Sequence, residues 1–456
     1  MASEQSMGMG NQPEMMASPP SPSSPPAPPS MGASAEPSMA GSMVDREANG
    51  VGHLYMQTNE IRNCIVHYHR SPDGTITEAE RCYTGGGGSG GYNPIVHRES
   101  TPNPFEGAYS VILSPDQRFL FTTNAGDNSV SSFAVGEDGR LTLLDAKRTG
   151  NVVPDRSGSA KALAYNPATG TLYVCHALGP DHIRLMSVDS EGRLTARPER
   201  YTVNLPDKPN RVATMAALSP DARFLVVGTT FDEPAKPNPD GSPILWVSHN
   251  GDAPHSVASN APDPDGLVVF PVNGEHGALG EGLFQDGGGA SPWNPLFLNH
   301  RPNQFVLGYA VSDGLSLATL DSDGKVTTGP VVKVDTSAGL PSELCWLSIS
   351  PDDRTVFATH FGYSYITTYR LEGNVLSVAQ DPACPKVPGN GAFRALNGTV
   401  SSGPSDNWLS PDGAYLYQIY GNASKLIGYR VEDDASLTEV TSADIPYNSC
   451  QGLAGF

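Results

Sequence analysis

The sequence predicts an all-β protein built from repeats of four short strands, and three observations support that prediction. First, a Ser-Pro-Asp turn recurs before apolar runs, centred on Pro115, Pro220, Pro351 and Pro411, with weaker copies at Pro167 and Pro302. Proline presets φ at the second position of a turn and Asp caps it, so each copy predicts a reversal between two strands. Second, turns containing Gly with Asp or Asn alternate with these reversals. Third, 49 Gly and 41 Pro against 17% charged residues indicate many turns and no long helices.

The spacing of the turns predicts the blades of a β-propeller. Successive prolines of the first turn type lie 49 to 82 residues apart, and a four-stranded blade repeats every roughly 40 to 50 residues. Seven hairpin turns between third and fourth strands are expected, at Asp73-Gly74, Asp138-Gly139, Glu191-Gly192, Asn273-Gly274, Asp323-Gly324, Gly373-Asn374 and Asp433-Asp434. Six inner strands are expected before the proline turns, at residues 108–114, 160–166, 212–218, 294–300, 344–350 and 405–410.

The missing seventh inner strand predicts how the ring closes. The first repeat opens at "GHLYMQTN", residues 52–59, which corresponds to a second strand and has no inner strand before it. The last segment, residues 449–456, follows the seventh repeat. If this segment pairs inside the first blade, no sheet edge stays open. The sequence therefore predicts a seven-bladed β-propeller over residues 51–456, closed by a C-terminal strand that completes the first blade.

Composition limits the cellular compartment and the classes of binding partner that can be expected. Residues 1–50 are rich in Pro, Ser and Met and poor in branched aliphatic residues, which predicts a disordered tail. A net charge of −20 argues against nucleic acid and anionic membranes as partners. No signal peptide or membrane span is recognisable. Six cysteines without a C-x-x-C spacing are typical of reduced thiols, and together these features favour the cytoplasm.

Propeller topology brings polar residues from different repeats to one face. Turns between second and third strands lie on the same face as the loops between blades, and we call this face the mouth. Asn59, Asn124, His176 and His360 are expected there because each ends a second strand. The starts of the inner strands are expected to add Glu106, Lys161, Arg211, Glu343 and Asp406.

These residue types suit the opening of an ester ring. Such a reaction needs a base for water, a donor or cation for the developing oxyanion, and an acid for the leaving alkoxide. The candidate catalytic residues are His176, His360, Glu343 and Glu106, and the candidate substrate-binding residues are Arg211, Lys161, Asn124 and Asp406. The alternative interpretation is that these polar residues line a water-filled channel, as they do in propellers without activity.

Three further stretches contain residues of the kinds that form or cover ligand sites. The glycine run at residues 84–94 lacks the G-K-[ST] ending and following helix of a phosphate loop, so a loop between blades is expected. His67 and His69 share one strand face, a spacing that can bind metal. No third ligand lies nearby in the sequence, so packing and no bound metal are expected. Residues 231–266 form a long insertion, for which we expect a lid over the mouth.

Several of these stretches together resemble a known family. They are "GHLYMQTNEIRNCIVHYHRSPDGTIT", "LSPDQRFLFTTNAGDNSVSSFAVGEDGRLTLLD", "ELCWLSISPDDRTVFATHFGYSYITTYRL" and the terminal "GLAGF". They resemble the lactonase family of seven-bladed propellers, which includes propeller-type 6-phosphogluconolactonases and 3-carboxymuconate cyclases. The resemblance implies a cofactor-independent lactone hydrolase or cycloisomerase acting on a small acidic lactone of the sugar-acid or muconate type.

A non-catalytic propeller remains the alternative function. It would bind a protein or a small ligand at the same mouth, and the Pro-rich tail or the 231–266 loop would be the place for a protein partner. One difference from the lactonase family favours this alternative. Its members have a His-containing run in the inner strand of an early blade, and this chain has Glu106-Gly107-Ala108-Tyr109 and Ser159-Ala160-Lys161 instead. The fold hosts both kinds of function, so it does not decide between them.

Overall fold

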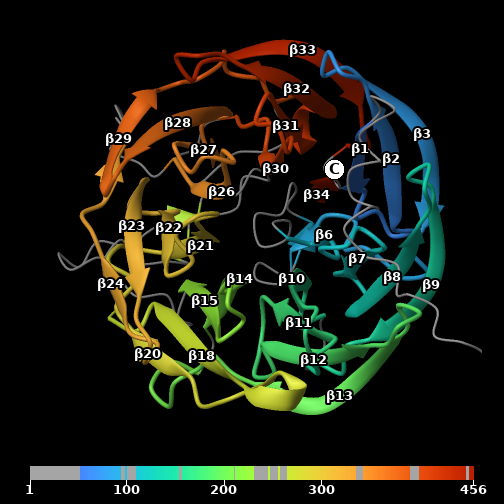
Figure 1. The fold of residues 1–456 in the computed structure, drawn as a ribbon, viewed down its shortest axis with the longest axis vertical. Helices are drawn as coiled ribbons and strands as arrows, with labels where there is room; N and C mark the ends of the chain where they lie inside the picture. Colours follow the sequence, from blue (N-terminus) through green and yellow to red (C-terminus); the bar gives the residue numbers. More distant parts are fainter. Residues whose placement is uncertain are drawn as a thin grey trace, which may run out of the picture.

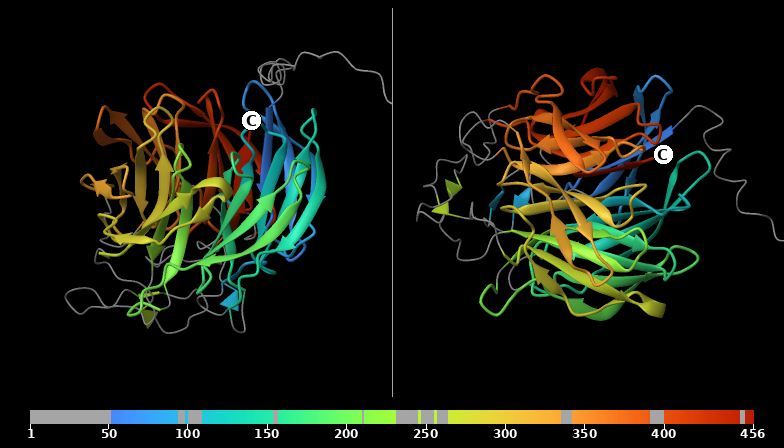
Figure 2. Two further views of the ribbon diagram at one scale, coloured as in Figure 1. Left: turned by 60° about the horizontal axis from the view of Figure 1, so that its bottom comes forward. Right: turned by 60° about the vertical axis from the view of Figure 1, so that its left-hand side comes forward.

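Seven sheets surround one central axis (Figure 1). The computed structural model describes residues 52–93, 98–99, 109–153, 157–209, 211–230, 245–246, 255–256, 264–334, 342–390, 400–447 and 451–456. The predicted tail, Glu106 and most of the 231–266 insertion lie outside the described residues. Each of the seven sheets has four or five antiparallel strands, which confirms the predicted propeller. The side views in Figure 2 show the strands running steeply between the two faces of the ring.

The blades follow one another along the chain, each from its inner to its outer strand. Blade 1 consists of β34 (Gln451–Gly455), β1 (Gly52–Gln57), β2 (Cys64–Arg70) and β3 (Ile76–Tyr83). Blade 2 consists of β6 (Val111–Leu113), β7 (Phe119–Asn124), β8 (Ser129–Val135) and β9 (Leu141–Arg148). Blade 3 consists of β10 (Ala160–Asn166), β11 (Thr171–His176), β12 (Ile183–Val188) and β13 (Leu194–Tyr201). Blade 4 consists of β14 (Val212–Leu218), β15 (Phe224–Thr230), β18 (Leu267–Asn273), β19 (Ala278–Leu279) and β20 (Leu283–Gln285).

The remaining three blades repeat the same order. Blade 5 consists of β21 (Pro292–Phe297), β22 (Gln304–Tyr309), β23 (Gly314–Leu320), β24 (Val326–Thr328) and β25 (Val332–Lys333). Blade 6 consists of β26 (Leu344–Ile349), β27 (Thr355–His360), β28 (Tyr365–Glu372) and β29 (Val375–Gln380). Blade 7 consists of β30 (Pro404–Leu409), β31 (Tyr415–Tyr420), β32 (Lys425–Val431) and β33 (Leu437–Asp444). Two short pairs stand apart, β4 (Tyr92–Asn93) with β5 (Arg98–Glu99) and β16 (Leu245–Trp246) with β17 (His255–Ser256).

The C-terminal strand closes the ring, as the repeat count predicts. Strand β34 pairs antiparallel with β1, with Leu54 opposite Gly455. His53 and Phe456 exchange two backbone hydrogen bonds of 2.8 and 3.0 Å just beyond this pairing. The two ends of the described chain therefore share one sheet, visible beside the C label in Figure 1. This closure leaves blade 1 without an open inner edge.

The recurring Ser-Pro-Asp turns end the inner strands in the same way. In blade 4, Ser219 donates a 2.6 Å hydrogen bond to Asp221 and its hydroxyl accepts a 3.0 Å bond from the backbone N–H of Phe224. The same two bonds recur at Ser114, Ser350 and Ser410. Each turn thus satisfies the first N–H of the next strand, which explains why the motif recurs.

Apolar side chains fill the spaces between neighbouring blades. Tyrosines on second strands extend this contact, since Tyr55, Tyr173 and Tyr417 each donate a hydrogen bond of 2.7 to 2.8 Å to a glycine carbonyl near the outer turn of the next blade. The phenols are buried and find a polar partner there, as a buried hydroxyl requires.

In the part of the chain that is described, we find no helix with the length and apolar character to cross a membrane.

Candidate active site at the propeller mouth

The inner strands are irregular at the mouth. The pairing register of β10 shifts between Ala160 and Ala162, which leaves Lys161 as an extra residue in the strand. The same kind of shift leaves Trp293 extra in β21 and Cys345 extra in β26. A bulge of this kind re-aims a side chain. Residues of blades 3 to 6, including Met215, Trp293 and Cys345, accordingly meet in one buried cluster.

Positive backbone φ angles accompany these irregular strand starts. Tyr109, Ser159, Ser291 and Glu343 have φ values of 59, 56, 59 and 58°, in the left-handed region that non-glycine residues rarely adopt. Each of them lies just before an inner strand of a different blade. Such strain persists only where the surrounding structure enforces it, and it gathers at functional sites. The mouth ends of the inner strands in blades 3, 5 and 6 thus combine a register shift with a positive φ angle at the preceding residue.

Two ionisable residues from different blades lie near one buried thiol on the mouth side of the inner strands. The Lys161 ammonium lies 5.1 Å from the centre of the Trp293 ring, and Lys161 and Glu343 are both buried. Both act on the thiol of Cys345: burial raises its pKa well above the usual value, Glu343 raises it further, and Lys161 opposes them. Lys161 of blade 3 and Glu343, which precedes the inner strand of blade 6, thus both lie within electrostatic range of the Cys345 thiol.

Asp406 lies in blade 7, where the ring closes. Its carboxylate accepts 3.0 Å hydrogen bonds from the backbone N–H groups of Asn407 and Leu453. Burial raises its pKa to about 7, although these hydrogen bonds favour the charged form. Asp406 also raises the pKa of Tyr109, after burial, and Tyr109 packs against the central cluster. The Asp406 carboxyl therefore lies near Tyr109, at the edge of the central cluster.

His360 lies in a hydrogen-bonded group between blades 5 and 6. Its Nδ1 lies 2.6 Å from Ser342 Oγ, and Ser342 donates to Asp313 through both its hydroxyl and its backbone N–H. Burial raises the pKa of Asp313 to about 7 and lowers that of His360 to about 3. The Nε2 atom of His360 has no hydrogen-bond partner among the described residues, and the ring stacks on Tyr365 at 4.9 Å.

His176 and Arg211 are held within the contacts between blades 2, 3 and 4. His176 Nε2 lies 2.8 Å from Thr149 Oγ1, and its Nδ1 lies 3.1 Å from the carbonyl of His182. Burial lowers the pKa of His176 to about 3. The guanidinium of Arg211 donates 2.6 Å bonds to Thr229 Oγ1 and to the Asp265 carbonyl. Both side chains are thus used in holding loops and blades.

Asn124 has a similar place between blades 1 and 2. Its carbonyl oxygen accepts from Asn63 at 2.8 Å and from Thr84 at 2.7 Å. Its amide nitrogen donates to Ser129 and Ser131 at 3.0 and 2.8 Å. The side chain is fully buried, and these four bonds use its whole capacity.

The structure thus divides the predicted site residues into two groups. Lys161 and Glu343 lie near the buried Cys345 thiol, and Asp406 lies near Tyr109, which packs against the same cluster. His360 lies in the neighbouring contact between blades 5 and 6. Asn124, His176 and Arg211 bridge neighbouring strands and loops, and Glu106 lies outside the described residues. Sequence reasoning missed Cys345, because nothing in the repeat pattern shows which residue of an inner strand is bulged. It also missed Asp313 and Ser342, because their hydrogen bonds join residues of two different blades.

The fold and the mouth together define a seven-bladed propeller with a buried polar centre. The family model described as "Lactonase, 7-bladed beta-propeller" matches residues 51–206. The 6-phosphogluconolactonase of Erwinia tasmaniensis is 22% identical over 327 residues, which are 71% of this chain and 80% of that protein. The resemblance to the lactonase family that the sequence shows is thereby confirmed.

Solved structures agree on the fold. The periplasmic gluconolactonase of Pseudomonas aeruginosa has a TM-score of 0.60 and 14% identity, with 89% of this chain and 99% of that chain covered. A putative 6-phosphogluconolactonase of Bacteroides uniformis has the same TM-score and identity, with coverages of 89% and 100%. At this identity the likeness establishes the propeller architecture alone.

Proposed function

We propose that the protein hydrolyses the lactone of a small acid at the propeller mouth. The observation that carries this proposal is that Lys161 and Glu343, a cation and a carboxyl group, are both buried at the bulged starts of β10 and β26 and both influence the Cys345 thiol. The lactonase resemblance supplies the reaction class. An acidic substrate fits a centre with a buried ammonium group, because the ammonium attracts a carboxylate or phosphate more strongly there than in water.

The proposed reaction needs no group beyond the side chains and one water. Glu343 accepts a proton from water as the water oxygen attacks the lactone carbonyl carbon. Lys161 stabilises the oxyanion that forms on the carbonyl oxygen. The ring C–O bond then breaks and the leaving alkoxide takes up a proton, for which Asp406, with a pKa of about 7, is the candidate donor. The product is the open hydroxy acid. His176 has no step in this proposal because both its ring nitrogens contact other groups.

Turnover of a lactone panel tests the proposal. The panel contains 6-phosphogluconolactone, gluconolactone and muconolactone, and hydrolysis is followed by proton release against the spontaneous rate. We expect Lys161→Met to lower kcat/KM by about 100-fold or more on the best substrate, as for loss of an oxyanion donor. Lys325→Met, which removes an exposed lysine from an outer turn of blade 5, is the control and should keep full activity.

The possible results test the lactonase activity and the role of Lys161 separately. No turnover above the spontaneous rate for any lactone would overturn the hydrolase proposal and leave the binding module as the better account. Turnover that survives Lys161→Met would keep the function and remove Lys161 from the site. A muconate-type substrate run toward ring closure tests the cycloisomerase alternative with the same variants.

A further inference from the structure

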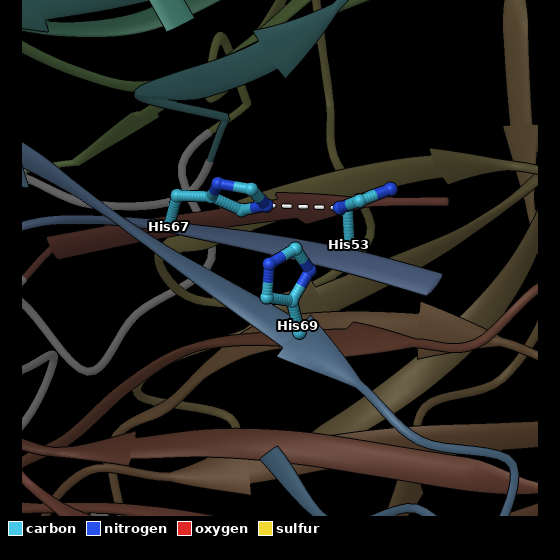
Figure 3. A group of neighbouring side chains, drawn as sticks. All are labelled: His53, His67 and His69. Carbon is cyan, nitrogen blue, oxygen red and sulfur yellow. Dashed lines mark hydrogen bonds between the residues drawn. The ribbon is translucent and has the colours of Figure 1, made fainter. Parts of the chain in front are cut away.

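Three histidines of blade 1 converge on the face opposite the mouth. His53 is the second residue of β1, and His67 and His69 lie in the middle and near the end of β2. The pairing of these strands sets His53 directly opposite His69. One ring nitrogen from each of the three residues can be chosen so that all lie within 4.8 Å of one another (Figure 3). We propose that His53, His67 and His69 bind one divalent transition metal ion of the Zn²⁺ class.

The distances suit three imidazole ligands on one ion. His53 Nδ1 and His67 Nε2 are already 2.9 Å apart. Zn–N bonds of roughly 2.0 to 2.1 Å in a tetrahedral site place ligand nitrogens about 3.3 Å apart. The third nitrogen, on His69, therefore has to approach by about an ångström or somewhat more, which a side-chain rotation can supply. Figure 3 shows the His69 ring directed toward the space between the other two rings.

Glu80 supports His67 as a metal ligand. While Nε2 of His67 faces His53, its Nδ1 lies 3.6 Å from Glu80 Oε1. A carboxylate behind the second nitrogen is the usual partner of a metal-bound histidine, because it fixes the ring and the tautomer. Glu80 is itself held in place, since it accepts a 2.7 Å bond from the backbone N–H of Leu141 in blade 2.

The histidines are better suited to a metal than to packing alone. Nδ1 of His69 is buried and has no hydrogen-bond partner among the described residues. A buried polar atom without a partner is costly. A metal ion would use the ring lone pairs, and the partly exposed His69 gives it a way in.

The position of the site assigns it a role in closing the ring. His53 exchanges backbone hydrogen bonds with Phe456, and their rings lie 4.9 Å apart. Gly139, in the turn of blade 2, packs so closely on His53 that an added Cβ would lie 2.2 Å from Nδ1. An ion at this point would hold β1 to β2 at the place where β34 completes blade 1. It would therefore stabilise the native ring and have no part in chemistry at the mouth.

Metal binding by the full-length, tag-free chain tests the proposal. The protein is stripped with EDTA and dialysed, and Zn²⁺ is titrated in competition with a chromophoric chelator. We expect one ion per chain with a Kd below about 1 µM, and a rise in Tm of a few degrees with excess Zn²⁺. Co²⁺ should give the visible absorption bands of a tetrahedral site. His69→Ala should weaken binding about 100-fold, and Glu80→Gln about 10-fold.

Controls keep the test independent of folding and of the proposed lactonase activity. His276→Ala removes an exposed histidine from blade 4 and should leave both Kd and the Tm shift unchanged. His69 is the most exposed of the three ligands, so His69→Ala should fold, with unchanged lactone turnover. Wild-type protein that takes up less than about 0.2 Zn²⁺ per chain at 10 µM overturns the proposal. So does stoichiometric binding that His69→Ala leaves unchanged, because the ion would then lie elsewhere.

Discussion

The two ends of the inner strands differ in how closely the blades resemble one another. At the end away from the mouth, four blades repeat one turn with the same serine and aspartate hydrogen bonds. At the mouth, blades 3, 5 and 6 repeat a bulge but place different side chains in it, Lys161, Trp293 and Cys345. The end away from the mouth therefore repeats the same turn residues in each of these blades. At the mouth, the same backbone bulge presents a different side chain in each blade.

We expect the largest loss of stability when the C-terminal strand β34, which closes the ring, is removed. Removing residues 451–456 deletes β34, together with the N–H that Leu453 donates to Asp406. It also exposes buried apolar surface of β1 and β6, because Leu453, Ala454 and Phe456 pack there. We expect a loss of more than about 4 kcal/mol in the free energy of unfolding, or no cooperative transition.

Chemical denaturation followed by fluorescence measures this loss. A chain lacking residues 1–50 is the control and should unfold like the full chain. If the truncation at residue 450 unfolds at the same denaturant concentration as the full chain, ring closure by β34 contributes little to stability.

A pH-dependent effect is expected at the mouth end of β30. Burial raises the folded-state pKa of Asp406 to about 7, above its ordinary value of 3.8. The native state therefore holds this proton more tightly, and the stability it contributes is present below about pH 4 and is lost as the pH rises toward 7. The slope is at most about 1.4 kcal/mol per pH unit. Asp406→Asn should remove this part of the pH dependence.

Unfolding free energies between pH 4 and 8 test this prediction as the difference between variant and wild type. Asp313, whose pKa burial also raises to about 7, is present in both proteins and cancels. The exposed Asp323→Asn is the matched control. A difference that does not change with pH would show that Asp406 titrates normally in the folded protein.

A smaller effect is expected at the regular end of a strand. Ser219→Ala removes the hydroxyl that accepts from the Phe224 N–H and donates to Asp221. A buried N–H loses its partner, so we expect a loss of about 1 to 2 kcal/mol in stability with lactone turnover unchanged. Ser190→Ala, at an exposed serine, should change neither. Lower turnover in Ser219→Ala with unchanged stability would contradict the assignment of stability to the turn end and of activity to the mouth end.

The same division explains how far the sequence could predict the structure. The seven blades and the closing strand follow from local turn signals, because the residues that make each turn are adjacent in the chain. Strand limits at the mouth were less accurate: residues 108–114 were expected as a strand, and β6 spans only Val111–Leu113. Tyr109 there has a positive φ, which the residue type does not reveal.

The candidate site was predictable by position and less so by role. Asn124 and His176 end second strands as expected, but their bonds go to Asn63, Thr84 and Thr149, which belong to other loops and strands. Such contacts depend on how blades pack against each other, and no local pattern encodes them. The third histidine of the proposed metal site was missed for the same reason, since strand pairing brings His53 to His69.

The most direct test compares the two ends of one strand, β26. Glu343→Gln changes the mouth end, and Ser350→Ala removes the hydroxyl that binds Asp352 and the Thr355 N–H at the other end. Lactone turnover and Tm are measured for both variants. We predict that Glu343→Gln lowers kcat/KM by about 100-fold or more with Tm nearly unchanged, and that Ser350→Ala lowers Tm by one to three degrees with full turnover. Full turnover in Glu343→Gln, or equal losses of turnover in the two variants, would contradict the account.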